Sequence, residues 1–184
     1  HANQYINLNR GEFPNFDFVR ALRKALSEND GTIFRYAAHE NTVLRQIREQ
    51  LNASLEADKN DLIEFIDSIT QWKNGKDTVE GPRNMIDMLQ WVKQYYYHGS
   101  MKGSNSIKKV LPAILSHSKF LQEKYSKPIY GSKEMSSLNL KEPTVWVRLQ
   151  NNTLMDPYKM LPPVFSDVPP EALETFLSKE DEEI

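Results

Sequence analysis

The sequence contains no cysteine, which excludes disulfide bonds, thiolate metal ligands and cysteine nucleophiles. No apolar run approaches the roughly 20 residues that a membrane-spanning helix requires, and there is no signal-peptide pattern. The HExxH, GxSxG, GxGxxG and Walker motifs are also absent, so none of the enzyme classes that they mark is indicated. From these absences we expect no membrane partner and a reducing, cytoplasmic location.

The length of 184 residues suits one domain, or one domain and a small annex, and a composition of 39% hydrophobic and 26% charged residues is typical of a globular protein. A net charge of −2 gives no overall sign of a nucleic-acid-binding protein. The charges are nevertheless unevenly distributed, because eight lysines and a single acidic residue lie between positions 93 and 133. This asymmetry predicts a basic face that meets an anion.

Hydrophobic spacing in the first half of the chain predicts helices that alternate with short strands. Gly31 is expected to stop the first helix, and a polar loop is expected over 73–83. The predicted helices are 15–30, a segment carrying Val43, Leu44, Ile47 and Leu51, 58–72 and 90–97, and the predicted strands are 32–38 and 84–89. This order is typical of an α/β fold, here rich in helix with a small sheet.

The next part of the chain begins with a turn-rich loop over 98–105 and a helix that Ser106 can cap. Pro112 lies inside that helical pattern, so we expect a kink or two short helices there. Another helix is expected over 118–125.

The composition changes after Ser126, since seven of the ten prolines follow it. In this loop-rich segment the pattern predicts one strand over 144–149 and one helix over 171–177. We therefore divide the chain into an α/β body, 1–125, and a proline-rich C-terminal annex, 126–184.

Glu40 follows the first predicted strand and opens the next helix, a position where open α/β enzymes bind ligands and metals. Mg²⁺ takes one or two protein carboxylates together with substrate phosphates, and Asp87 in the second predicted strand can face the same edge. The structural alternatives are a favourable helix-start acid for Glu40 and a helix cap or turn acid for Asp87. For the neighbouring His39 we favour a structural role.

A second group of residues has the character of a phosphate-binding cradle. A glycine-containing loop leads into a helix start that is rich in lysine and serine, and free amides at such a start attract anions. A tyrosine run just upstream, with Tyr96 at its centre, can stack on bases. The alternative is a solvated lysine face beside tyrosines packed on the core. The candidate residues are Lys102, Ser104, Ser106, Lys108, Lys109 and Tyr96.

The order of these motifs resembles the middle of a ribonuclease-H-like, DEDD-type exonuclease domain, and more narrowly an uncharacterised bacterial family of such domains. The resemblance covers about 15–115, with PIYG and DPYKMLPPVF further along also fitting the narrower family. Its motifs are YAAHENTVL from Tyr36, NMIDMLQWVK from Asn84 and GSNSIKKVLP from Gly103.

The resemblance implies a metal-dependent nuclease that hydrolyses phosphodiesters with Mg²⁺ or Mn²⁺. Glu40 matches the second acidic position, a catalytic metal ligand in the superfamily, whereas Asp87 matches an aspartate that is usually not a ligand. Ser106, Ile107 and Lys108 match the start of a helix beside the substrate groove. The other three acidic positions have no match here, so we expect an internal fragment of the fold that is catalytically incomplete.

Two further expectations follow. A fragment without its central strands would expose sheet edges, which favours a homodimer through those edges. The alternative function is a non-enzymatic nucleic-acid-binding or protein-interaction module, in which the lysines and tyrosines matter and Glu40 only supports its helix. The two functions differ in whether binding requires a divalent metal.

Overall fold

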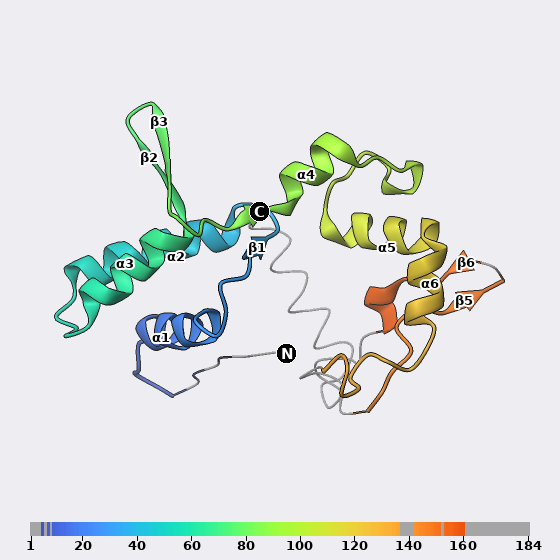
Figure 1. The fold of residues 1–184 in the computed structure, drawn as a ribbon, viewed down its shortest axis with the longest axis horizontal. Coiled ribbons are helices and arrows are strands. Elements are labelled where there is room, and N and C mark those ends of the chain that lie inside the picture. Colours follow the sequence, from blue (N-terminus) through green and yellow to red (C-terminus); the bar gives the residue numbers. More distant parts are fainter. Residues whose placement is uncertain (1–4, 6, 8, 137–141, 152, 161–184) are drawn as a thin grey trace.

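The structure, a computed structural model, describes residues 5, 7, 9–136, 142–151 and 153–160. It is mixed α/β and rich in helix, as the hydrophobic spacing predicts (Figure 1). The helices are α1 (Asn15–Leu26), α2 (His39–Ala53), α3 (Lys59–Ile69), α4 (Met88–Tyr95), α5 (Ile107–His117) and α6 (Lys119–Tyr125), with short 3₁₀ turns η1 (Gly99–Met101) and η2 (Pro157–Met160). The strands are β1 (Phe34–Arg35), β2 (Gln71–Asn74), β3 (Asp77–Glu80), β4 (Ile86–Asp87), β5 (Leu149–Gln150) and β6 (Thr153–Leu154).

Helices α1, α2 and α3 enclose the larger of the two hydrophobic cores. Their apolar residues recur every three or four positions, so each helix buries one face and leaves the opposite face in water. The fully or nearly fully buried residues of this core are Val19, Leu44, Ile47, Leu51, Leu62, Ile66, Ile69 and Met85.

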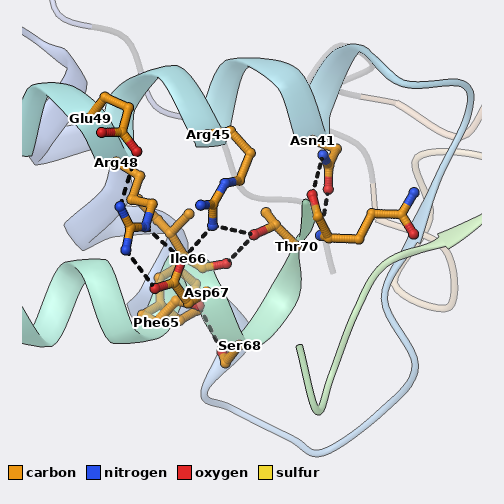
Figure 2. A network of polar contacts seen from close by, with 10 residues as sticks. Asn41, Arg45, Arg48, Glu49, Phe65, Ile66, Asp67, Ser68 and Thr70 are labelled. Atoms are coloured by element: carbon orange, nitrogen blue, oxygen red, sulfur yellow. Dashed lines mark hydrogen bonds and ion pairs between the residues drawn. The ribbon is translucent and has the colours of Figure 1, made fainter. Parts of the chain in front are cut away.

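Arginine–carboxylate pairs and one amide pair hold α2 against the end of α3 (Figure 2). Asp67 accepts hydrogen bonds from Arg45 and from Arg48, the latter at 2.8 Å from Nε to Oδ1. Asn41 both donates to the carbonyl of Gln71 at 3.0 Å and accepts from its N–H at 2.9 Å, as a neighbouring strand would. These contacts fix the first turn of α2, where the candidate ligand Glu40 lies, relative to the rest of the core.

The first helix ends earlier than Gly31, which corrects the sequence-based boundary. Helix α1 stops at Leu26, and Ser27 bonds the carbonyl of Arg23 through both its N–H and its hydroxyl. Beyond that point the guanidinium of Arg83 donates to the carbonyls of Leu26, Asn29 and Gly31. A distant arginine thus satisfies carbonyls that a longer helix would have used, and no local pattern encodes this contact.

The two strands predicted at 32–38 and 84–89 exist, but only two residues of each are paired. Strand β1 pairs in parallel with β4, with Phe34 opposite Ile86 and Arg35 opposite Asp87. β4 is short because the side chain of Asp87 caps α4, which begins at the next residue. The carboxyl ends of both strands lie at the same edge, as a parallel pair requires.

The predicted polar loop over 73–83 is wrong, because most of it is a β-hairpin. Strand β2 pairs with β3 in antiparallel register, with Asn74 opposite Asp77. The two-residue turn between them starts at Gly75, whose φ of 63° suits the first central position of a hairpin turn. A glycine at the first of two turn residues is typical of a hairpin turn, so the sequence carried information that the prediction did not use.

A second, smaller core forms where α4, η1 and α5 meet. Met101, Val110 and Ala113 are buried in it, and Val92, Tyr96 and Ile114 pack against them. Helix α5 runs unbroken through Pro112, so two helices divided at that residue were a wrong prediction. The carbonyl that Pro112 leaves free belongs to Lys108 in the exposed first turn, where water can hydrate it. The break comes instead at Ser118, whose side chain caps α6.

The described part of the annex folds back on α5 and α6. The N–H groups of Trp146 and Val147 both donate to the carbonyl of Tyr125, Val147 is buried, and the Trp146 ring stacks on Tyr130. Of the strand predicted over 144–149, Thr144 forms an isolated bridge with Tyr130 and Leu149 pairs with β6. The donors between them, on Trp146 and Val147, are used by Tyr125. The helix predicted over 171–177 lies outside the described residues.

Candidate functional site at the strand ends

The carboxylate of Asp87 lies at the edge where β1 and β4 end, and it is used in structural hydrogen bonds. Its Oδ1 accepts hydrogen bonds from the N–H groups of Ala37 and Leu89, each at 3.0 Å, and its Oδ2 lies 3.7 Å from Nη1 of Arg35. These partners give the aspartate the helix-capping role that was the structural alternative in the sequence. They also leave it poorly suited to hold a metal ion.

Ala37 turns the chain sharply between β1 and α2. Its φ of 73° lies in the left-handed region, which costs a non-glycine residue roughly 1–3 kcal/mol. The hydrogen bond from its N–H to Asp87 helps to hold this conformation. Strained backbone of this kind is concentrated at functional sites, and here it lies two residues before the start of α2.

Glu40 lies in that first turn and is exposed. Among the described residues its carboxylate has no hydrogen-bond or ion-pair partner. It borders an apolar cavity of about 420 Å³ that is also lined by Phe34, His39 and Val43. The carboxylate is therefore free to bind a cation. Its negative charge also interacts favourably with the positive end of the α2 dipole. Within the described residues no three His, Cys, Asp or Glu side chains are grouped as a metal site.

Tyr36 connects this edge to the lysine-rich segment. Its hydroxyl donates to the backbone carbonyl of Asn105, across 69 positions of sequence. Burial raises the pKa of Tyr36, and the nearby Asp87 carboxylate raises it further, so the phenol stays protonated and able to donate. Glu40 follows Tyr36 by four residues and Ser106 follows Asn105 directly, so the two predicted groups are joined through this contact.

The start of α5 has the features of an anion-binding site. Ser106 is the N-cap, its side chain makes no capping bond, and Lys108 and Lys109 are exposed in the first turn. Two cations at the positive end of a helix dipole are unfavourable unless an anion balances them. Just before them, Ser104 accepts a hydrogen bond from the N–H of Ser106, and Lys102 is exposed with a φ of 51°.

Tyr96 lies half-buried against the second core, and its hydroxyl is buried without a hydrogen-bond partner among the described residues. Burial raises the pKa of this phenol. Its neighbours Tyr95 and Tyr97 are more than four-fifths exposed. Of the tyrosine run, these two rather than Tyr96 present rings on which a base can stack.

Comparison with known proteins adds one finding. The DUF2779 family, described as a domain of unknown function, matches residues 1–106. The chain belongs to the DUF2779 family. The match includes Tyr36, Glu40, Asp87 and the segment up to Ser106. No curated protein and no solved structure matches the chain.

The sequence-based candidates therefore fall into two groups, one around Glu40 and one around the start of α5. Two residues that support this edge of the strand pair, Arg35 and Tyr36, were not among the sequence-based site candidates. Arginine in a two-residue strand and tyrosine at its end carry no local signal of their own. Their importance depends on contacts with residues some 50 or more positions away.

Proposed function

We propose that this chain is the nucleic-acid-binding part of a metal-dependent nuclease with a ribonuclease-H-like fold. The observation that carries the proposal is the hydrogen bond from Tyr36 to Asn105, which joins the element bearing Glu40 to the lysine-rich start of α5. The proposal treats Glu40 and this helix start as two parts of one binding surface near the carboxyl edge of the parallel strand pair. Phosphodiester chemistry uses both.

In this proposal Lys102, Lys108 and Lys109, with the free amides at the start of α5, hold the phosphate backbone. Glu40 contributes one ligand to Mg²⁺ or Mn²⁺. This role suits its carboxylate, which is exposed and has no partner among the described residues. When bound, such an ion supplies Lewis-acid stabilisation to the phosphate. Cleavage needs further acidic ligands beyond Glu40, so the proposal assigns binding to this chain and cleavage only to an assembly that supplies them.

Binding is tested by measuring affinity for a single-stranded oligonucleotide over a range of salt concentrations. The double variant Lys108→Glu/Lys109→Glu is expected to weaken binding and to lower the slope of log K against log salt by about 1.4, since each phosphate contact contributes about 0.7. The matched control is Lys24→Glu/Lys76→Glu, which changes the net charge equally at two exposed sites outside α5. An equal loss in both variants would reject a site at α5.

The metal role is tested by isothermal titration with Mn²⁺ on the wild type and on Glu40→Gln. Because Glu40 is exposed, the substitution is not expected to disturb the fold. We expect the variant to lose Mn²⁺ binding. Unchanged binding would remove Glu40 from the site and favour a second candidate function, a nucleic-acid-binding module without metal. That candidate is supported by the structural use of Asp87.

The cytoplasmic location and the homodimer remain predictions. A homodimer through the edges of the β1–β4 pair is tested by sedimentation at several concentrations. Among the described residues, no helix is both long enough and apolar enough to cross a bilayer.

A further inference from the structure

A polar cavity of about 530 Å³ lies between β4, the end of the β2–β3 hairpin and the first turns of α4. It is distinct from the apolar cavity beside Glu40. The alternation of side chains along β1 explains the separation, because Phe34 lines the apolar cavity and the next residue, Arg35, lines the polar one.

Arg35 is a buried cation with an unused hydrogen-bonding edge. Its side chain is only 4% exposed. Nη1 donates to the carbonyl of Ala37 and lies 3.7 Å from Oδ2 of Asp87, whereas Nε is buried without a partner. Among the described residues Nη2 has no hydrogen-bond partner either. The Nε–Nη2 edge is therefore a pair of parallel donors that lacks an acceptor pair.

The charges around this edge indicate which kind of hydrogen-bond acceptor the site can bind. Asp87 already balances the guanidinium, and Glu80 adds a second carboxylate to the lining of the cavity. A phosphate dianion would add more negative charge to a site that is already net negative. A neutral ligand with two adjacent acceptors fits better, and the O6 and N7 atoms of guanine are the neutral pair that arginine binds most often.

The other walls of the cavity suit a planar base. Trp91 is about half exposed and its ring lies edge-on to Phe34, 6.0 Å between centroids, which leaves aromatic surface for stacking. Asn84 has an Oδ1 atom that is buried without a partner, and Gln90 adds a second amide from the first turn of α4. Such amides pair with the N–H groups of a base.

We infer that this cavity binds a guanine base of single-stranded nucleic acid, with the Nε–Nη2 edge of Arg35 donating to N7 and O6. The ligand class rests on the proposed function, whereas the donor edge and the cavity do not. The site would give a nucleic-acid-binding chain a preference for one base, which phosphate contacts at α5 cannot supply.

The ligand side is tested first, by saturation-transfer NMR and calorimetry on the full chain without metal. The probes are guanosine, 7-deazaguanosine, adenosine and inorganic phosphate. Guanosine is expected to bind about tenfold or more tightly than 7-deazaguanosine, which lacks only the N7 acceptor, and adenosine is expected to bind as weakly. Equal binding of guanosine and adenosine, or displacement of guanosine by inorganic phosphate, would overturn the assignment.

The protein side uses two variants on one helix. Gln90→Leu changes a cavity residue, and Gln94→Leu makes the same change one turn further along α4, at an exposed residue outside the cavity. Gln90→Leu is expected to weaken guanosine binding several-fold and Gln94→Leu to leave it unchanged. Arg35→Lys keeps the charge but loses the donor pair, and should abolish the difference between guanosine and its 7-deaza analogue. Equal guanosine binding in the wild type and Gln90→Leu would count against the site.

These experiments separate the two proposals. Free nucleosides contain no phosphodiester and the titrations contain no metal, so a failure of Glu40 to bind Mn²⁺ leaves guanosine binding unaffected. Conversely, if guanosine does not bind, the role of Lys108 and Lys109 is still tested independently by the salt dependence of oligonucleotide binding.

Discussion

Two regions of the molecule use charge in opposite ways. In the first region, residues 15–87, arginines pair with carboxylates between helices, for example Arg20 with Glu56 and Asp58. Every ion pair between described residues lies in this region, and the cation is always arginine. In the second region, residues 99–125, lysines are exposed and none pairs with an acid among the described residues. In the first region the guanidinium groups of arginine hold helices together, whereas the lysines of the second region stay available for a ligand.

The hydrophobic cores of the two regions also differ, in the number of residues that they bury. The first region contains most of the larger core, whose buried residues come from all three helices and the segment before β4. Among the described residues, the second region has only three buried residues in its core. We conclude that the first region supplies most of the stability, whereas the second region presents to solvent lysines that are unpaired within the described part of the chain. Four substitutions, in order of decreasing effect on the free energy of unfolding, test this difference.

Gly81→Ala is expected to destabilise the protein most, by about 3 kcal/mol. A Cβ at this position would lie 2.1 Å from the backbone carbonyl oxygen of Asp67, where the hairpin passes the end of α3. Urea unfolding measures the change. The control in the second region is Gly99→Ala, where a Cβ meets nothing within 4 Å and the expected change is below about 0.5 kcal/mol. Similar effects of the two substitutions would contradict the tight packing of the first region.

Asp67→Asn is expected to cost about 2 kcal/mol, because it leaves Arg45 and Arg48 half-buried without their shared carboxylate. Burial acts to raise the pKa of Asp67, but the hydrogen bonds from the two arginines outweigh it and lower the pKa. A lowered carboxyl pKa stabilises the fold above the unfolded-state pKa, and this contribution is lost as pH falls through the folded-state pKa.

Thermal unfolding across pH therefore distinguishes the wild type from Asp67→Asn. The difference between them is expected to be full at neutral pH and to shrink in acid. Asp61→Asn is the control, since Asp61 is largely exposed and lies 3.9 Å from Arg23, and it should change stability by less than about 0.5 kcal/mol. A difference that stays constant down to strongly acidic pH would show that the charge of Asp67 is not the cause.

Tyr36→Phe removes the hydrogen bond that connects the two regions and is expected to cost about 1 kcal/mol. The effect should be local to the junction. Amide hydrogen exchange is expected to accelerate at the start of α5, around Ser106 to Val110, while the amides of α2 and α3 keep their protection. Acceleration throughout the first region instead would mean that the two regions unfold as one unit.

Lys108→Glu/Lys109→Glu is expected to have the smallest effect on stability and the opposite sign. Negative charge is stabilising at the positive end of a helix dipole, so α5 should gain about 0.3 kcal/mol for each replacement. Arg48→Glu in the first region reverses one charge as well, but should destabilise the fold because Asp67 loses a partner. If both reversals destabilise the protein, the lysines of α5 have a structural role that the described contacts do not contain.

Much of this architecture follows from local patterns in the sequence. The apolar spacing in α1, α2, α3 and α6 predicts those helices, and the alternation of helices and short strands predicts a mixed α/β fold. Boundaries were less predictable, as in α1, which ends at Leu26 rather than near Gly31 because Arg83 binds the carbonyls that follow. The hairpin over β2 and β3 was not predicted, although Gly75 opens its turn, because its strands are polar and lack an alternating apolar face.

Local patterns alone place Glu40 at a helix start and gather lysines around the beginning of α5. They also identify the helix cap as the structural role open to Asp87. Contacts between distant segments are what commit Asp87 to that role, join Tyr36 to the carbonyl of Asn105 and bury Arg35 with an unused donor edge. The physical reason is range: helix starts and charge clusters depend on neighbours within a few residues, whereas hydrogen-bond partners and burial depend on which distant segments meet.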